Sequence, residues 1–288
     1  MNPETPRRSV LYMPGANERA LEKAKTLPTD ALILDLEDSV APDAKPEARD
    51  RVAAAAASGE YGYREVTIRV NAPGTPWHAD DVRAAAEAGP AGVVVPKVDT
   101  PETVREVEAA LEKAGAPDTT AIWAMIETPK ALFAATAIAE ASPRLTVLVL
   151  GTNDLVKELR AEHVPGRAPL LTGLSLALLA ARATGRAVLD GVYNDVRDTA
   201  GFEAETLQAR QFGFDGKTLI HPGQIEPCNR IFAPAEEEVE RSRRIIAAFE
   251  EATSQGRGVV TVDGRMIENL HVEEARRVLA LAAAVAGR

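Results

Sequence analysis

The chain has 288 residues, and its 33 Lys and Arg against 43 Asp and Glu give a formal net charge of −10. This length accommodates one large α/β barrel or two medium domains. The acidic balance excludes an extended nucleic-acid surface, since phosphate recognition normally needs a basic patch. The single cysteine, Cys228, excludes an internal disulfide and a CxxC-type zinc site. The start, MNPETPRRSV, has no apolar signal core, and no stretch approaches about 18 apolar residues, so we expect a cytoplasmic protein with no membrane partner.

Short apolar runs rich in β-branched residues recur along the chain. Most are nearly continuous, such as ALILD, GVVVP and TVLVL, which is typical of parallel strands buried on both faces. The eight predicted strands are Ser9–Tyr12, Ala31–Asp35, Val66–Val70, Gly92–Val98, Ala121–Ile126, Val147–Leu150, Ala187–Val192 and Lys217–Ile220.

Alanine-rich amphipathic stretches separate most of these runs. Proline near the first turn marks several helix starts, and we expect helices over Asp43–Ala57, Pro101–Ala114 and Pro129–Glu140. Eight strand–helix units in about 220 residues predict an α/β fold of the (β/α)8 TIM-barrel type. An open doubly wound sheet is the alternative. The segment MPGAN after the first strand is not GxGxxG, which disfavours a dinucleotide-binding fold.

The last part of the chain exceeds what a barrel needs. It contains a charged helix over Pro234–Thr253, a turn over Gly256–Gly264 and a final helix from His271. We therefore predict a catalytic barrel over residues 1–224 and a C-terminal helical arm over residues 225–288, which serves as a cap or an oligomerisation element.

Polar and charged residues follow the predicted strands, at the barrel end where active sites are built. Charged groups beside apolar strands are costly to bury unless they are paired or bind a metal. The residues at these positions are Asp35, Glu37, Asp38, Arg69, Asn71, Lys97, Glu127, Asn153, Asp154, Asp190, Asn194 and His221.

Two of these carboxylates, Glu127 and Asp154, follow consecutive strands and are expected to converge. Converging carboxylates repel each other, and a divalent cation is the usual resolution. Mg²⁺ suits such a site because it takes one or two carboxylates and completes its octahedron with water and substrate oxygens. The alternative for Asp154 is a helix cap, since the helical segment DLVKEL begins there.

Three other residues at the strand ends each have two interpretations. Arg69 presents a guanidinium that either grips a carboxylate substrate in bidentate fashion or forms a salt bridge to Asp35 or Glu37. Lys97 neutralises the acidic cluster or, alternatively, forms a Schiff base with a carbonyl substrate. His221 is more typical of a structural residue that is hydrogen-bonded at a strand end than of a catalytic base.

Several motifs occur together and in order: RRSVLYMPGANERALEKA, ILDLEDSVAPDAKPEAR, IRVN, VVPKV, MIET, GTNDL and GKTLIHPGQI. In this combination the chain resembles the citrate lyase β-subunit-like family of metal-dependent carbon–carbon lyases, within the HpcH/HpaI aldolase group. The match runs from Arg7 to the final helix. The resemblance implies a TIM barrel, a homotrimer or a hexamer built as a dimer of trimers, and a small-molecule acyl-CoA substrate such as malyl-CoA, citramalyl-CoA or a citryl thioester.

The resemblance also implies roles for individual residues. The family's Mg²⁺ ligands fall on Glu127 and Asp154, with Mn²⁺ as the replacement ion, and its oxo-acid-binding arginine falls on Arg69. Contacts to the substrate and to coenzyme A fall on Tyr12, Arg19, Lys23 and Asn153, while Asp35, Glu37, Lys97 and His221 support the site.

The family's C-terminal arm covers a neighbouring subunit's site and carries a catalytic Asp. Here VDGRMIENLHV has Glu268 at that position, which makes Glu268 the predicted acid/base. The extra methylene moves the carboxylate by about 1 Å, and such a shift reduces rates by roughly a hundredfold. This departure, together with ENLHV, GTNDLVKEL and LDGVYNDVRD, resembles the subgroup that contains the malyl-CoA thioesterases.

The resemblance leaves the reaction open between two outcomes for (3S)-malyl-CoA. Hydrolysis yields malate and coenzyme A, whereas retro-Claisen cleavage yields acetyl-CoA and glyoxylate. The alternatives are a citramalyl-CoA or citryl-CoA lyase, a citrate lyase β-type subunit that works with an acyl-carrier partner, and a Schiff-base aldolase acting through Lys97.

Overall fold

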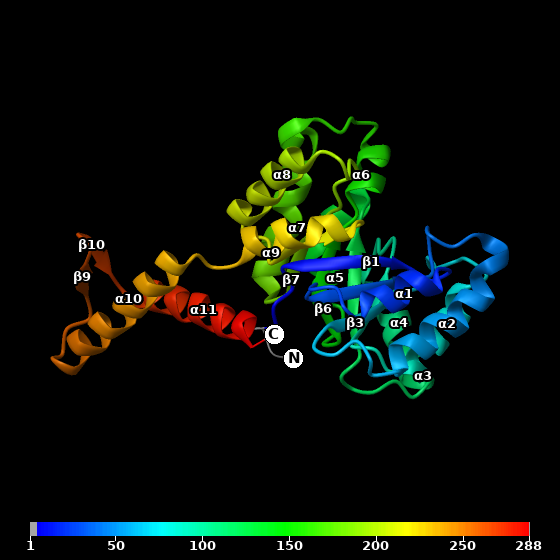
Figure 1. The fold of residues 1–288 in the computed structure, drawn as a ribbon, viewed down its shortest axis with the longest axis horizontal. Coiled ribbons are helices and arrows are strands. Elements are labelled where there is room, and N and C mark those ends of the chain that lie inside the picture. Colours follow the sequence, from blue (N-terminus) through cyan, green and yellow to red (C-terminus); the bar gives the residue numbers. More distant parts are fainter. Residues whose placement is uncertain (1–4, 288) are drawn as a thin grey trace. The chain divides into compact units, whose positions relative to one another are not determined.

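The structure, a computed structural model, describes residues 5–287. Residues 9–219 contain a closed barrel of eight parallel strands in which each strand pairs with the next along the chain and the eighth pairs with the first. Figure 1 draws several of these strands with the helices around them. The strands are β1 Ser9–Pro14, β2 Ala31–Asp35, β3 Glu65–Arg69, β4 Gly92–Val95, β5 Ala121–Ile126, β6 Leu145–Leu150, β7 Ala187–Asp190 and β8 Gly216–Leu219.

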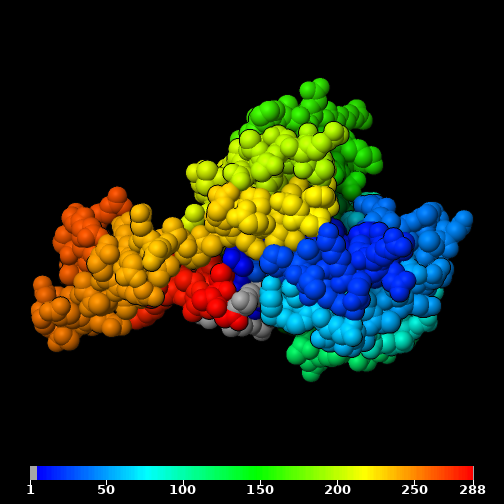
Figure 2. Space-filling view, viewed as in Figure 1, coloured from blue at the N-terminus to red at the C-terminus, as the bar shows by residue number. Residues whose placement is uncertain are grey.

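A helix follows every strand of the barrel. These helices, with three short 3-10 turns, are α1 Glu18–Ala24, η1 Pro42–Ala44, α2 Lys45–Ala57, α3 His78–Ala88, α4 Pro101–Lys113, α5 Pro129–Glu140, α6 Thr152–Leu159, η2 Pro165–Leu170, α7 Leu171–Thr184, α8 Thr199–Phe212, η3 Pro222–Gln224 and α9 Ile225–Phe232. At the surface of this unit, α1 (dark blue) lies beside α2 (lighter blue), as Figure 2 shows.

The barrel interior is filled by side chains at alternate strand positions. One buried cluster contains Ile33, Trp123, Met125, Val149 and Leu189, with half-buried Tyr12 packed against it. Because side chains alternate along a strand, the next inward positions toward the carboxyl ends are Asp35 after Ile33 and Glu127 after Met125. The apolar pattern that fills the barrel therefore also points the polar residues of its carboxyl end inward.

The described chain divides into two compact units, one of residues 7–231 and the other of residues 5–6 and 232–287. The second unit consists of α10 Glu236–Ser254, a hairpin of β9 Val260–Val262 and β10 Arg265–Ile267, and α11 Asn269–Ala286. Its own small core is formed by Ile245, Ile267, Val272 and Ala275.

The closed barrel confirms the predicted fold class, and the open-sheet alternative is wrong. The strands β2, β5 and β6 end where predicted, whereas β1 runs two residues further, β3 and β8 stop one residue earlier, and β4 and β7 stop three and two residues earlier. The fourth strand stops at Val95, since Pro96 has no N–H for the ladder and Lys97 has a left-handed backbone with φ of 52°. The seventh stops at Asp190 because Gly191 begins the loop.

The predicted turn over Gly256–Gly264 is also partly wrong. It contains β9, and Asp263 and Gly264 form its two-residue link to β10, both with positive φ. An Asp-Gly pair is a preferred hairpin turn, so DG was the local signal for this element. The last helix begins at Asn269 rather than His271.

Within residues 5–287, we find no helix with the length and apolar character needed to span a bilayer.

Candidate active site

The strand register brings residues of neighbouring strands together at the carboxyl end of the barrel. Ile126 of β5 pairs with Leu150 of β6, and the Gly151 N–H donates to the Ile126 carbonyl at 3.1 Å. Glu127 directly follows β5 and Gly151 directly follows β6, so these two residues lie side by side. On the opposite strands, Asp35 of β2 pairs directly with Arg69 of β3.

Glu127 is a buried carboxylate, with 2% of its surface exposed. Its Oε1 accepts a hydrogen bond of 2.6 Å from the main-chain N–H of Lys97. The pKa of Glu127 is raised to about 7, mainly by burial and also by the negative charges of Glu37 and Asp154, against the lowering effect of the Lys97 N–H. A carboxylate in this position favours either a proton or a cation.

Asp154 is the third residue of α6 and is half-buried. The N-cap of α6 is Gly151 and no side chain caps the helix, so the alternative interpretation of Asp154 as a cap is wrong. Among the described residues, the Asp154 carboxylate has no hydrogen-bond or ion-pair partner, and its charge raises the pKa of Glu127. The two predicted metal ligands therefore lie near each other, as the consecutive strands required.

The donor set at this position is small. Across residues 5–287, no group of three or more His, Cys, Asp or Glu side chains is arranged to hold a metal ion. A cation here would therefore take two side-chain carboxylates, and Mg²⁺ accepts that because waters and substrate oxygens complete its shell. The raised pKa of Glu127 and the unpartnered Asp154 both fit such an ion.

Arg69 is buried and forms a double hydrogen bond with Asp35. Its Nε and Nη2 donate to the two Asp35 oxygens at 2.6 and 2.8 Å, and its Nη1 lies 2.8 Å from Glu37 Oε2. Of its two predicted interpretations, the structure shows the salt bridge. Nη1 also reaches the exposed Asp38 at 3.3 Å, so this edge of the guanidinium faces the more open side of the site.

Asp35 and Glu37 respond oppositely to this arrangement. Burial raises the pKa of Asp35, but the Arg69 charge and hydrogen bonds from Arg69, Ser39 and Glu37 outweigh it, and the net pKa is lowered. Burial raises the pKa of Glu37 to about 7 despite the opposing Arg69 charge. Asp35 therefore serves as the fixed anion that orients Arg69.

Tyr12 lies inside the barrel beneath this pair. The guanidinium carbon of Arg69 is 4.8 Å from the Tyr12 ring centroid, a cation–π contact. The Tyr12 hydroxyl lies 4.0 Å from Met125 Sδ, and burial raises the pKa of this hydroxyl. The ring therefore supports Arg69 from below as a neutral phenol.

Lys97 lies between the two acidic groups. Its Nζ is 3.8 Å from Glu37 Oε1 and its side chain is half-exposed. Partial burial lowers the pKa of Lys97, but the charges of Glu37, Asp154 and Glu127 outweigh this effect, and the net pKa is raised. The amine is thus held as an ammonium, which favours the neutralising role predicted for it and weighs against a nucleophilic one.

Asn153 and His221 have local partners. Asn153 on α6 exchanges two side-chain hydrogen bonds with Asn194 of the β7–α8 loop, at 2.7 and 3.1 Å. His221 caps η3: its Nδ1 accepts from the Gly223 N–H at 3.0 Å, and Gln224 Oε1 accepts from the His221 N–H. These contacts agree with the structural interpretation of His221, a residue hydrogen-bonded at a strand end.

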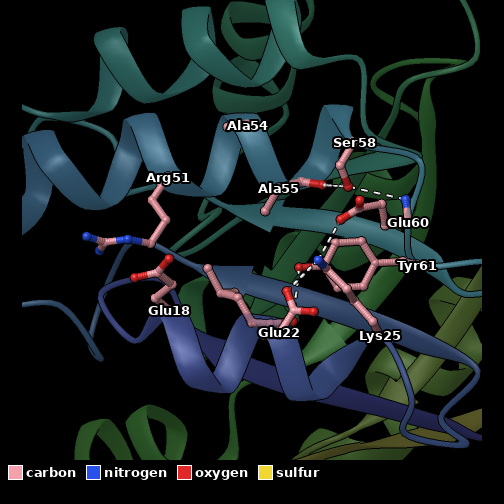
Figure 3. Close-up of a pocket in the computed structure, with 10 residues that line it drawn as sticks. Glu18, Glu22, Lys25, Arg51, Ala54, Ala55, Ser58, Glu60 and Tyr61 are labelled. Carbon is pink, nitrogen blue, oxygen red and sulfur yellow. Dashed lines mark hydrogen bonds and ion pairs between the residues drawn. The ribbon is translucent and has the colours of Figure 1, made fainter.

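Arg19 and Lys23 lie one turn apart on α1, and both are exposed. A groove between α1 and α2 lies nearby, and Figure 3 shows Lys25 between Glu22 and Glu60 within it. None of the predicted site residues lines this groove. Within residues 5–287, neither basic side chain forms a hydrogen bond or ion pair with the cluster around Glu127.

Glu268 belongs to the second unit, where it is exposed and is the N-cap of α11. Its side chain accepts from the His271 N–H, and His271 Nδ1 accepts from the Glu268 N–H at 3.0 Å. This capping box fixes the backbone of Glu268 at the junction between the hairpin and the last helix.

Asp190 lies at a strand end but does not belong to the candidate site. Leu189 faces the barrel interior, so Asp190 faces the surrounding helices. There it accepts hydrogen bonds from Lys217 Nζ at 2.7 Å and from Arg167 Nη1 at 2.7 and 2.8 Å. The alternation along β7 was the signal that could have separated it from the inward-facing acids.

Sequence reasoning missed Gly151 and Lys45. A Cβ at position 151 would overlap Glu127, so only glycine fits there. Lys45 Nζ donates to the main-chain carbonyls of Leu36 and Glu37 at 2.8 Å each and so holds the loop that carries Glu37. Gly151 is the N-cap of α6, and glycine is common at N-caps, so the sequence carried no signal for its contact with Glu127.

Known proteins match the whole chain. The HpcH/HpaI aldolase/citrate lyase family model matches residues 8–222, and the model of TIM-barrel C–C bond lyases matches residues 171–286. A (3S)-malyl-CoA thioesterase of Cereibacter sphaeroides is 49% identical over 98% of this chain and 96% of its own length. The citrate lyase subunit beta of Escherichia coli is 40% identical over 96% and 93%.

A solved structure has the same architecture. The protein CitE from Mycobacterium tuberculosis, crystallised with magnesium, acetoacetate and coenzyme A, superposes with a TM-score of 0.80 at 28% identity and covers 97% of this chain and 99% of that one. From the barrel, the motifs and these matches together, the chain belongs to the HpcH/HpaI aldolase/citrate lyase family.

Proposed function

We propose that this chain is a Mg²⁺-dependent enzyme that acts on a short β-hydroxyacyl-CoA, (3S)-malyl-CoA. The observation that carries the proposal is the convergence of two carboxylates, Glu127 and Asp154, near a fixed arginine, Arg69, at the carboxyl end of the barrel. Support for the substrate comes from the malyl-CoA thioesterases, which are 48–49% identical to this chain over nearly its whole length.

Glu127 and Asp154 would hold the Mg²⁺ ion. Structures of CitE with magnesium and small oxo-acids or acids support this choice of metal. When bound, the ion would polarise a substrate oxygen and stabilise negative charge on it. Lys97 and Arg69 both form ion pairs with Glu37. The negative charges of Glu127 and Asp154 would then be the ones left to balance the dication.

The remaining groups would orient the substrate. Arg69 is held by Asp35 and Tyr12, and its Nη1 edge would take the carboxylate of the acyl group. Asn153 would contact the acyl end from the rim. Arg19 and Lys23 offer exposed cations for the phosphates of coenzyme A.

Glu268 would act as the general acid/base, delivered by the second unit of a neighbouring copy. The proposal therefore includes a homotrimer or hexamer, in which residues 225–288 cover another subunit's barrel. A carboxylate at this position would take a proton from the attacking water during hydrolysis, or protonate the leaving enolate during cleavage.

Between the two outcomes, the matches favour hydrolysis to malate and coenzyme A, because the most similar relatives reported above are named thioesterases. One experiment separates them: (3S)-malyl-CoA is incubated with the enzyme and Mg²⁺, and glyoxylate and free thiol are measured separately. Hydrolysis releases thiol alone, and retro-Claisen cleavage releases glyoxylate alone. A protein that forms neither product from malyl-, citramalyl- or methylmalyl-CoA, with Mg²⁺ or Mn²⁺, is not the proposed enzyme.

A second candidate is a citrate lyase β-type subunit, which the 40% identity to the Escherichia coli subunit favours. Such a subunit would need an acyl-carrier partner. Co-purification with a small carrier protein supports this candidate, whereas turnover of a free CoA ester by the isolated chain removes it.

A further inference from the structure

The carboxylate of Glu127 has a main-chain hydrogen-bond donor on one side and a residue without a Cβ on the other. On one side, the Lys97 N–H donates to Oε1 at 2.6 Å. On the other, a Cβ built on Gly151 would overlap Oε2 and would lie 2.5 Å from Cβ and 3.1 Å from Cδ of Glu127. The Glu127 side chain therefore occupies the space that any side chain at position 151 would need.

The backbone of Gly151 does not require glycine. Its φ of −94° and ψ of 77° lie outside the left-handed region, so other residues can adopt them. As the N-cap of α6, this position would normally favour Ser, Thr, Asp or Asn, whose side chains cap the helix. Glycine is also accepted at N-caps, so helix capping alone does not exclude a side chain at position 151, whereas the close contact with Glu127 does.

The backbone of Lys97 has the opposite property. Its φ of 52° is left-handed, a conformation that costs a non-glycine residue about 1 kcal/mol. This turn directs the Lys97 N–H at Glu127, and Pro96 precedes it. The half-exposed ammonium extends elsewhere, toward Glu37.

We infer that Gly151 and the main chain of Lys97 are positioning residues that fix the orientation of Glu127 for metal binding. Lys97 occupies Oε1, while Gly151 leaves room for Oε2. In the part of the chain that the structure describes, Oε2 accepts no hydrogen bond, so it is the oxygen left for the ion. The inference rests on the proposed function, because it deepens the Mg²⁺ site formed with Asp154.

The first test replaces Gly151 and measures metal binding without turnover. Mn²⁺ is titrated into the full-length protein, and unbound Mn²⁺ is followed by electron paramagnetic resonance. Gly151→Ala should bind Mn²⁺ about 10–100-fold more weakly than the wild type, the range for residues that orient a metal ligand. Gly258→Ala is the matched control, since Gly258 has open space around it and a φ outside the left-handed region. It should bind like the wild type.

Equal Mn²⁺ affinity of Gly151→Ala and the wild type, within about threefold, overturns the role of Gly151. Gly151→Ser adds a second criterion. Serine is a preferred N-cap, so a gain in thermal stability together with unchanged Mn²⁺ affinity would mean that capping, not space, governs this position.

The second test separates the Lys97 main chain from its ammonium and does not depend on Gly151 variants that fold. Lys97→Gly and Lys97→Ala both remove the ammonium, but glycine adopts the left-handed backbone without strain. We expect Lys97→Gly to bind Mn²⁺ about fivefold more tightly than Lys97→Ala. Identical affinities of the two variants overturn the main-chain role.

The wild-type titration distinguishes failure of this inference from failure of the proposed function. If the wild type binds no Mn²⁺, the metal-dependent function and the inference both fall. If the wild type binds Mn²⁺ and consumes malyl-CoA while Gly151→Ala binds equally well, only the inference falls.

Discussion

Arg69 and Asp35 occupy paired positions on adjacent strands and are joined by two hydrogen bonds of 2.6 and 2.8 Å. Both side chains are buried, and the Tyr12 ring lies beneath the guanidinium. The planar arginine matches the two carboxylate oxygens, which lysine cannot do. Asp35 therefore sets the orientation of Arg69 and leaves only the Nη1 edge near Glu37 and Asp38 for other contacts.

Replacing Asp35 should destabilise the barrel strongly. Asp35→Ala leaves the buried Arg69 with only part of its compensation, and breaking such a pair costs about 3–5 kcal/mol in the free energy of unfolding. Urea denaturation of the metal-free protein measures the loss. The control is Asp118→Ala, which breaks an ion pair of the fully exposed Asp118 with Arg144 and should cost far less, because solvent screens exposed ion pairs. Equal losses in the two variants would contradict the role of Asp35.

Metal affinity should depend on pH through Glu127. Its pKa of about 7 lies above the ordinary value near 4.5, so a proton occupies the carboxyl below neutrality. A cation needs the ionised form, and its affinity should fall about tenfold per pH unit as the pH drops from about 7 to about 5. Above about pH 8 the affinity should level off. Mn²⁺ titrations at several pH values measure this profile, and a flat profile would refute the assignment.

The Glu37→Gln variant tests whether the charge of Glu37 contributes to the raised pKa of Glu127. Burial is the main cause of the raised pKa of Glu127, and the charge of Glu37 adds to it. Removing that charge should lower the pKa of Glu127 and move the pH midpoint of Mn²⁺ binding downward. A midpoint that moves upward would mean that Glu37 acts on Glu127 with the opposite sign.

The sequence predicted the barrel well because the strands are buried on both faces and alternate with helices. The positions of all eight strands followed from their apolar runs. The ends were harder to predict, since they depend on backbone details: Lys97 adopts a left-handed conformation that no pattern of apolar residues reveals. The hairpin before α11 had the Asp-Gly pair as its one local signal, because its strands are only three residues long.

The candidate site was predictable only in part. Position after a strand indicated Asp35, Arg69 and Glu127, which share the inward face. Position after a strand could not exclude Asp190. The inward-facing residue of β7 is Leu189, so the next residue, Asp190, faces the surrounding helices. The hydrogen bond from the Lys97 main chain to Glu127, and the space that Gly151 leaves for Glu127, carry no side-chain signal in the sequence.

Lys97 should not form a Schiff base with substrate. The surrounding carboxylates hold its pKa above the ordinary value, so the amine stays protonated and is not nucleophilic. Borohydride added during turnover of malyl-CoA should therefore leave the protein mass unchanged, and EDTA should abolish activity. A covalent adduct at Lys97 together with EDTA-resistant activity would establish the aldolase alternative.

Replacing Glu268 should change which products form from malyl-CoA, while the protein should still fold. As the N-cap of α11, it is replaceable by Asp, itself a preferred cap, while Glu268→Ala should cost about 1 kcal/mol of stability. We expect Glu268→Asp to keep or raise glyoxylate formation from malyl-CoA, because it restores the carboxylate position of the family's lyases. Glu268→Ala should lose activity. Loss of both products in Glu268→Asp contradicts the positional argument.

Subunit mixing tests whether Glu268 acts on a neighbouring barrel. Glu268→Ala and Arg69→Ala chains should each be inactive, since one lacks the proposed acid/base and the other the proposed substrate-binding arginine. If the arm of one subunit completes the barrel of another, co-refolded or co-expressed mixtures contain sites in which a wild-type Glu268 meets a wild-type Arg69. Thiol release should then reappear in the mixture at a fraction of the wild-type rate. If mixed oligomers form but stay inactive, Glu268 acts within its own chain or not at all, because only delivery in trans can combine the two intact residues.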